Sequence, residues 1–161
     1  MKSAYERSAD ERRLLCLVRQ LSVKTVIFDV EPLVASWDSD QEALDHGVAL
    51  ALSHVAAIPR VLVVCFATNS ARYPSAMPDI PAIQVVYLAS ARKPLRTRPY
   101  QHLPRPGVVI GDQVITDGIL ARRLGYAFLH YRPPAHAVPL GPLLLSGLGQ
   151  LVRPIVFARQ R

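Results

Sequence analysis

The sequence predicts a single α/β domain in which a parallel sheet is covered by helices. Short runs of β-branched and apolar residues recur along the chain, separated by segments whose apolar residues have helical spacing. This alternation favours right-handed crossovers and therefore a parallel sheet. The chain has 161 residues, half of them hydrophobic, which suffices for one core and excludes a largely disordered protein. One domain over 1–161 is expected, with its core at about 22–133 and an apolar C-terminal extension at 134–161.

Five strands and several helices are expected. Each strand is a short run typical of a buried parallel strand. The strands are expected at 24–30, 61–67, 83–89, 108–110 and 127–131. Between and before them we expect an amphipathic helix over 4–21, a helix over 41–58, a short helix or loop over 95–106 and a helix over 119–125. Asp40 is placed to cap the second of these, Pro59 closes it, and Gly125 has the position of a C-terminal cap.

Composition bounds the partners and the setting. The net charge of +7 favours anionic partners, namely phosphates, acidic lipid surfaces or nucleic acid. A nucleic-acid binder is poorly supported, because the sequence has no aromatic–basic stacking pattern and no known binding motif. The two cysteines, Cys16 and Cys65, are too few for a disulfide framework and indicate a reduced, cytoplasmic setting. The first 13 residues are charged throughout and lack an apolar core, so no signal peptide is expected.

The C-terminal extension is apolar but is interrupted by glycine, proline and arginine. It offers no stretch of about 20 apolar residues, which a membrane-spanning helix needs. A short helix with an apolar face is expected there, and that face would either dock on the sheet or lie in a membrane interface. Its residues would be Leu143, Leu144, Leu148, Leu151 and Val152.

Polar side chains follow the first two predicted strands, where each strand ends. Asp29 and Glu31 could hold a metal ion, divide nucleophile and acid roles, or form a solvated strand exit. Thr68, Asn69 and Ser70 suit either an oxyanion, since each can donate a hydrogen bond, or an ordinary turn. Because the carboxyl ends of parallel strands share one edge of the sheet, these groups are expected to lie together.

The next two strand ends carry a lysine and two aspartates. Lysine occurs at only three positions in this arginine-rich chain, so Lys93, which precedes a proline, is expected to be a placed cation. Asp112 and Asp117 are two of only three acidic residues after position 46. They could act where open α/β sheets bind ligands, or serve as a helix cap and a first-turn charge. Together the four strand ends supply what phosphoryl transfer needs: a carboxylate nucleophile, a hydroxyl and a cation for phosphate, and acids for Mg²⁺.

These motifs resemble the haloacid dehalogenase (HAD) superfamily, specifically the small subfamily IIIA phosphatases of the YqeG and phosphatidylglycerophosphatase type. The resemblance spans about 22–133, and the last motif is the closest match. The matching stretches are Phe28–Glu31 with Trp37, Ala67–Ser70, Arg92–Pro94 and Gly111–Asp117.

The resemblance implies a three-layer, Rossmann-like fold with strand order 3-2-1-4-5 and no large cap domain. It implies that Asp29 is the nucleophile that forms an aspartyl-phosphate, and that Thr68, Asn69 and Lys93 bind the phosphoryl group. It also implies one Mg²⁺ ion, held by Asp29, the Glu31 backbone carbonyl and Asp112, with Asp117 in or near the metal shell. These are the site residues that we carry forward.

One departure from the family pattern concerns the acid–base residue. The family has an aspartate two residues after the nucleophile, whereas this chain has Glu31 followed by Pro32. Glutamate keeps the chemistry but reaches one methylene further, and a misplacement of about 1 Å can cost ~10²-fold in rate.

From the resemblance as a whole, we expect a Mg²⁺-dependent phosphomonoester hydrolase, acting on a phosphatidylglycerophosphate-like lipid from the cytoplasm or the inner membrane face. The alternative is a catalytically weak HAD-fold protein with a binding or regulatory role.

Overall fold

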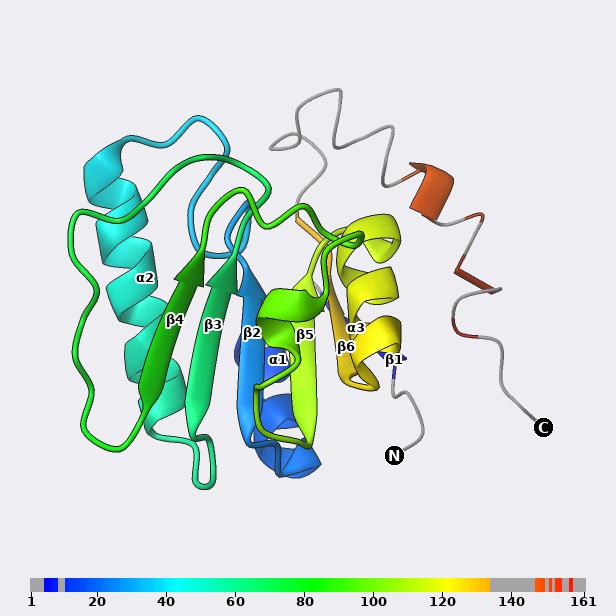
Figure 1. Ribbon diagram of the computed structural model, residues 1–161, viewed down its shortest axis with the longest axis horizontal. Helices are drawn as coiled ribbons and strands as arrows, with labels where there is room; N and C mark the ends of the chain where they lie inside the picture. The colour runs from blue at the N-terminus through cyan, green and yellow to red at the C-terminus, as the bar shows by residue number, and fades with distance from the viewer. Residues whose placement is uncertain are drawn as a thin grey trace.

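The computed structural model describes residues 5–8, 11–133, 147–149, 151, 153–154 and 157. Within them, six strands form one sheet in the order β1-β6-β5-β2-β3-β4 (Figure 1). All pairs are parallel. The strands are β1 (Tyr5–Ser8), β2 (Thr25–Asp29), β3 (Val63–Ala67), β4 (Gln84–Leu88), β5 (Gly107–Gly111) and β6 (Ala127–Tyr131). The five predicted strands are present, and their predicted order 3-2-1-4-5 is confirmed as β4-β3-β2-β5-β6.

The first predicted helix is wrong at its start. Instead of one helix over 4–21, the chain forms β1 and then α1 (Glu11–Leu21). Strand β1 pairs in parallel with β6, with Tyr5 opposite Phe128 and Ser8 opposite Tyr131. The segment Tyr-Glu-Arg-Ser has no strand pattern of its own, so pairing with a neighbour far along the chain decides its conformation.

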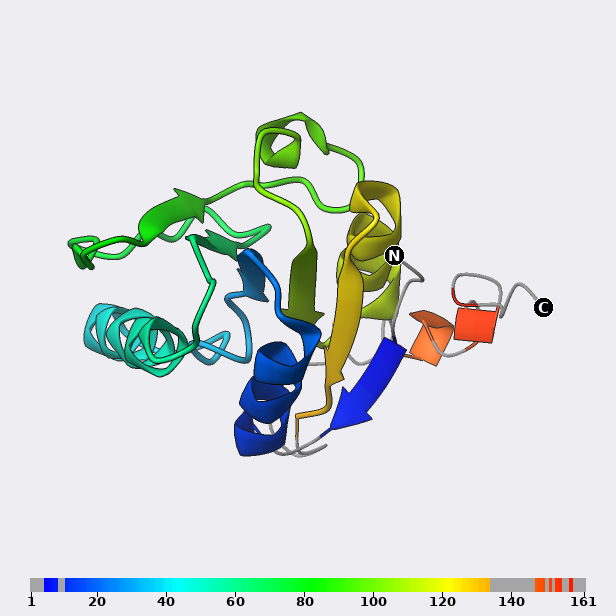
Figure 2. The ribbon, with the colours of Figure 1, turned by 90° about the horizontal axis from the view of Figure 1, so that it is seen from below.

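Helices cover both faces of the sheet (Figure 2). On one face α1 and α2 (Gln41–Ala56) pack Leu14, Val18, Leu44, Val48 and Leu52 against alternate strand residues. On the other face lie the 3₁₀ turn η1 (Arg98–Tyr100), the π-helical turn η2 (Val114–Gly118) and α3 (Ile119–Leu124). There Tyr100, Leu120 and Leu124 pack on Ile27, Cys65 and Val109. Side chains alternate across each strand, so both faces of the central strands are buried.

The predicted bounds of the helices over 41–58 and 119–125 are confirmed to within a few residues, as α2 and α3. Asp40 caps α2, because its Oδ1 accepts a hydrogen bond from the Ala43 backbone nitrogen at 2.9 Å. Gly125 ends α3 with φ +69°, a left-handed conformation that favours glycine. The turn η2, which precedes α3, was not predicted and contributes to the site described below.

Loops follow β2 and β3 at the carboxyl edge of the sheet. Residues 30–40 and 68–83 contain neither a helix nor a named strand. The described part of the chain holds no helix with the length and apolar character that crossing a membrane requires.

In the C-terminal extension, Phe157 stacks on Phe128 of β6 with ring centroids 5.6 Å apart, whereas Leu148 and Leu151 are exposed. Leu143, Leu144 and Val152 lie outside the described residues.

Candidate active site

Four buried charged side chains meet at the carboxyl edge of the sheet. Asp29 ends β2, Lys93 lies in the loop after β4, Asp112 follows β5 directly, and Asp117 lies in η2. Lys93 Nζ is 2.7 Å from Asp29 Oδ1 and 2.7 Å from Asp117 Oδ1. All four residues are buried, and Asp117 is 0% exposed. The chain thus brings together residues from positions 29 to 117, as their places at strand ends predict.

Glycine at position 111 makes this approach possible. A methyl group there would come within 2.5 Å of the Asp117 carboxylate carbon, so any larger side chain would displace Asp117. The turn η2 holds Asp117 from the other side, because its backbone nitrogen donates to the Gln113 carbonyl at 2.8 Å. Asp117 Oδ2 in turn accepts from the Gln113 backbone nitrogen at 3.3 Å.

Capping roles do not describe the two aspartates. Neither carboxylate oxygen of Asp112 has a hydrogen-bond partner among the described residues, although both oxygens are buried. Asp117 is wholly buried, so it is not a solvated first-turn charge. A buried carboxylate without partners is costly, and such a group calls for a ligand, a proton or an ion.

The carboxylates of Asp29, Asp112 and Asp117 fit a small cation. One oxygen from each lies within 4.8 Å of the others. The cluster contains three carboxylates, and the described cation that contacts them is Lys93. Ionised, the three carboxylates therefore carry more negative charge than this lysine balances. Mg²⁺ prefers oxygen ligands such as those of carboxylates, and the two unpartnered oxygens of Asp112 are available to bind such an ion. The cluster therefore passes a chemical test for a hard divalent cation.

Burial and mutual repulsion shift the acidities of these groups. Burial raises the pKa of Asp112 to about 7, with a further increase from the Asp117 carboxylate and an opposing effect from Lys93. Burial also raises the pKa of Asp29 well above its usual value; Asp117 adds to the increase and Lys93 opposes it. Burial alone would lower the pKa of Lys93, but the Asp117 and Asp29 carboxylates raise it, so this lysine stays protonated.

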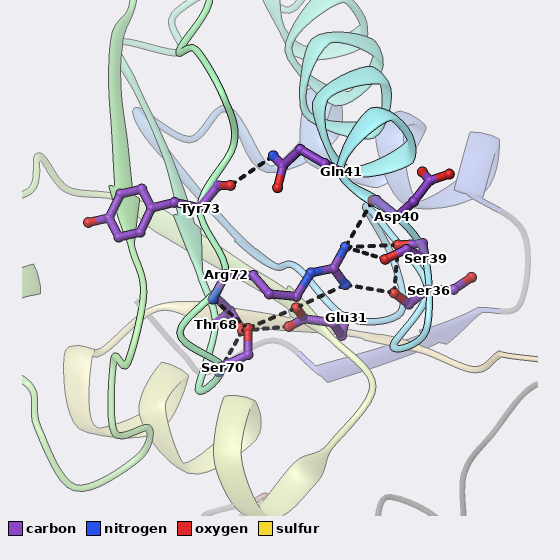
Figure 3. Close-up of polar contacts among 9 residues, drawn as sticks. All are labelled: Glu31, Ser36, Ser39, Asp40, Gln41, Thr68, Ser70, Arg72 and Tyr73. Carbon is purple, nitrogen blue, oxygen red and sulfur yellow. Dashed lines mark hydrogen bonds and ion pairs between the residues drawn. The ribbon is translucent and has the colours of Figure 1, made fainter.

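A second group of side chains forms the neighbouring part of the site (Figure 3). The Glu31 carboxylate is buried and accepts two hydrogen bonds, from Thr68 Oγ1 to its Oε2 at 2.5 Å and from Ser70 Oγ to its Oε1 at 3.1 Å. Thr68 Oγ1 also accepts from the Ser70 backbone nitrogen at 2.9 Å. Each hydroxyl has a single proton. The Ser70 proton is directed at Glu31, and the Thr68 proton has two acceptors within reach, Glu31 Oε2 at 2.5 Å and Ser70 Oγ at 3.0 Å.

Arg72 ties two loops together beside Glu31 and was not singled out from the sequence. Its guanidinium donates to the Ser36 carbonyl at 3.0 Å, the Ser39 carbonyl at 2.8 Å, Ser39 Oγ at 3.1 Å and the Asp40 carbonyl at 3.2 Å (Figure 3). It also lies 3.9 Å from Glu31 Oε1. No local signal marks this arginine in a chain so rich in arginine.

Members of both groups line one pocket of about 190 Å³, although Asp112 and Asp117 are not among its lining residues. Its lining includes Asp29 and Lys93 of the first group, Glu31, Thr68 and Ser70 of the second, and the half-buried Trp37. Arg72 extends the predicted set. Trp37, Ser70, Gln113 and Thr116 also line the pocket and come from the stretches that match the family motifs.

Asn69, which was expected to bind phosphate, contacts the lysine loop. Its Oδ1 accepts from the Lys93 backbone nitrogen at 2.7 Å, and its Nδ2 donates to the Lys93 carbonyl at 3.3 Å. It therefore positions Lys93, and its contact with a phosphate stays a prediction.

Comparison with known proteins adds no further assignment. No protein-family model, curated protein or solved structure matches the chain.

Proposed function

We propose that this protein is a Mg²⁺-dependent phosphomonoester hydrolase of the HAD type. One observation carries the proposal: Asp29, Lys93, Asp112 and Asp117, which come from three strand ends and the turn η2, converge in a single buried cluster beside Thr68. A nucleophilic carboxylate, a fixed cation and a set of cation-binding carboxylates are the parts that phosphoryl transfer through an acyl phosphate requires.

Each residue has a role in this proposal. Asp29, Asp112 and Asp117 would hold Mg²⁺, with the Glu31 backbone carbonyl as a further ligand by resemblance. The ion would neutralise charge on the carboxylates and on the phosphoryl oxygens. Lys93 would hold a phosphoryl oxygen with its fixed positive charge, and Thr68 would donate its hydroxyl proton to another.

The chemical steps then use Asp29 and Glu31. Glu31 first takes up a proton from solvent. An Asp29 oxygen then attacks phosphorus, the bond from phosphorus to the leaving oxygen breaks, and that oxygen takes the proton from Glu31. Water then attacks the aspartyl-phosphate, passes a proton to Glu31, and releases phosphate with Asp29 restored. Both steps require Glu31 to leave the Thr68 and Ser70 hydroxyls that hold it in the described arrangement.

The held position of Glu31 favours a second candidate function, a HAD-fold protein with little turnover that binds a phosphorylated partner. Both oxygens of its carboxylate are engaged by the Thr68 and Ser70 hydroxyls. If Glu31 stayed in place, the carboxylates of Asp29, Asp112 and Asp117 could still bind a metal ion, but no acid would protonate the leaving group.

A phospholipid headgroup of the phosphatidylglycerophosphate type is the substrate that we favour. Among the described residues, the loops 30–40 and 68–83 beside the pocket hold no helix and no named strand that could form a cap, so a bulky substrate can reach it. The loop that presents Lys93 also carries Leu95, which is 79% exposed, and the exposed Arg92, Arg96 and Arg98. An apolar side chain among arginines suits the surface of an anionic bilayer.

The test is phosphate release from an aryl phosphate and from phosphatidylglycerophosphate, with Mg²⁺ and with a chelator. We expect Mg²⁺-dependent turnover in the wild type and a loss of at least about 100-fold in Asp29→Asn, because Asp29 is the proposed nucleophile and its amide cannot form the acyl phosphate. Glu31→Asp should slow turnover by about 10- to 100-fold, because the shorter side chain would not reach the leaving oxygen.

Asp38→Asn, which removes one exposed carboxylate from the same loop, is the matched control and should retain wild-type rates. Activity that persists in Asp29→Asn would refute the proposed nucleophile. Binding of Mg²⁺ without turnover in the wild type would favour the second candidate.

A further inference from the structure

The hydroxyl pair of Thr68 and Ser70 has the form of an oxyanion site. The two side chains lie on the turn after β3, with their oxygens 3.0 Å apart, and both line the pocket that also contains Asp29 and Lys93. Two donors at this separation can serve two oxygens of one planar or tetrahedral anion. In the described arrangement those oxygens belong to Glu31.

We propose that Glu31 is an internal occupant of this site, which an oxyanion must displace before it can bind in the pocket. The glutamate side chain at position 31 is long enough to place one oxygen on each hydroxyl. An aspartate is one methylene shorter and would not reach both. The inference deepens the proposed function and rests on it in one respect, that the natural ligand is an oxyanion such as a phosphate group.

Arg72 makes the displacement feasible. Its guanidinium is anchored to the loop at 36–40 by hydrogen bonds to Ser36, Ser39 and Asp40, so it stays beside Glu31 whichever anion the hydroxyls hold. The guanidinium lies 3.9 Å from Glu31 Oε1, so its positive charge is close to the carboxylate in addition to the two hydroxyls. A carboxylate that leaves the hydroxyl pair therefore keeps a counter-charge within a buried site.

Displacement of a resident anion weakens apparent affinity. The affinity for an incoming anion is reduced by the fraction of molecules in which the hydroxyls are free. The charge of Glu31 adds repulsion, because it lines the same pocket as the incoming anion. Removing the carboxylate should remove both effects, and so tighten anion binding even in a protein that has no turnover.

The experiment measures binding of inorganic phosphate to the full chain at fixed Mg²⁺ and pH. The single tryptophan of the chain, Trp37, lines the pocket, so its fluorescence reports occupancy there. Glu31→Gln removes the charge and leaves an amide that can accept from only one hydroxyl. We expect it to bind phosphate at least about tenfold more tightly than the wild type, as freed donors and lost repulsion together require.

Two comparisons make the result specific. Asp38→Asn removes the same charge from an exposed position of the same loop and should change phosphate affinity by less than about twofold. Adding Thr68→Val to Glu31→Gln removes one donor and should cancel most of the gain. If Glu31→Gln fails to fold, Glu31→Ala takes its place, because it also leaves both hydroxyls free.

Phosphate affinity in the Glu31 variant equal to or weaker than that of the wild type would overturn the inference, as would the absence of phosphate binding in every variant. The proposed function fails separately, through turnover that is absent or independent of Asp29. Tighter phosphate binding in Glu31→Gln without any turnover would retain the internal occupant and reject the enzyme.

Discussion

Asp112 is a residue of the site whose buried charge has no balancing contact among the described residues. Its carboxylate is buried, both oxygens lack a partner among the described residues, and its pKa is raised to about 7, chiefly by burial and then by Asp117. A carboxyl group that binds its proton more tightly in the folded state stabilises the fold below its unfolded pKa, near 3.8. That contribution is lost as pH rises through about 7.

This imbalance predicts how stability and metal binding depend on pH. Without metal, the wild type should lose stability between pH 4 and 7 on account of Asp112, by up to about 4 kcal/mol. Asp112→Asn, which cannot ionise, should be more stable than the metal-free wild type at pH 8. Mg²⁺ competes with the proton for the carboxylate, so the rise in Tm that it causes should grow from pH 5 to pH 8 in the wild type.

Thermal unfolding with Mg²⁺ and with chelator, at several pH values, measures both effects. Asp79→Asn, which removes an exposed carboxylate far from the cluster in sequence, is the control and should respond to Mg²⁺ as the wild type does. A Mg²⁺ effect on Tm that is unchanged in Asp112→Asn would exclude this carboxylate as a ligand.

At the scale of elements, the strand β5, its terminal Gly111 and the turn η2 act as one unit. Gly111→Ala would force the new methyl group against the Asp117 carboxylate, which the turn holds in place. We expect a loss of about 1–3 kcal/mol in the free energy of unfolding, typical of overpacking, and weaker Mg²⁺ binding because Asp117 must move.

Gly147→Ala is a matched control, because a methyl group at Gly147 meets no atom within 4 Å. Denaturant unfolding and Mg²⁺ titration of both variants would check the prediction. Equal behaviour of the two would show that Asp117 does not depend on the close approach.

The sequence predicts elements well where local pattern and burial agree. The apolar runs that end in Asp29 and just before Asp112 are central strands, so both their existence and the meeting of their carboxyl ends follow from periodicity and from the parallel sheet. Strand β1 was missed because its pairing with β6 is its main determinant. The Glu31 contacts with Thr68 and Ser70 were missed because they depend on the rotamers of three polar side chains, and the spacing of residues along the chain does not determine rotamers.

At the scale of the whole molecule, exposed arginines lie at both edges of the sheet, near the pocket and away from it. Arg96 and Arg98 are exposed on the loop that carries Lys93 and Leu95, whereas the exposed Arg19 and Arg60 precede strands β2 and β3 at the opposite edge of the sheet. If a lipid is the substrate, only the first pair should face the bilayer.

Flotation with vesicles that contain acidic lipid tests this orientation. We expect binding at low salt that weakens as salt is raised, because the attraction is screened. Arg96→Gln with Arg98→Gln should weaken binding by roughly 25-fold, from about 1 kcal/mol for each arginine near the surface. Arg19→Gln with Arg60→Gln changes the net charge equally and should bind almost as the wild type does. Equal losses in both would point to attraction by net charge alone.

The π-helical turn η2 has a consequence for the phase of the chain between β5 and α3. In an α-helix each residue advances by about 100°, so one residue more or less redirects every side chain beyond it. The Gln113 carbonyl accepts from both Asp117 and Gly118, which accommodates one extra residue in the turn. Asp117 can therefore face the strand ends while Leu120, Ala121 and Leu124 still face the core. If one residue were deleted from this turn, the helix could still form. Asp117 and the apolar residues of α3 could then no longer face the strand ends and the core at the same time.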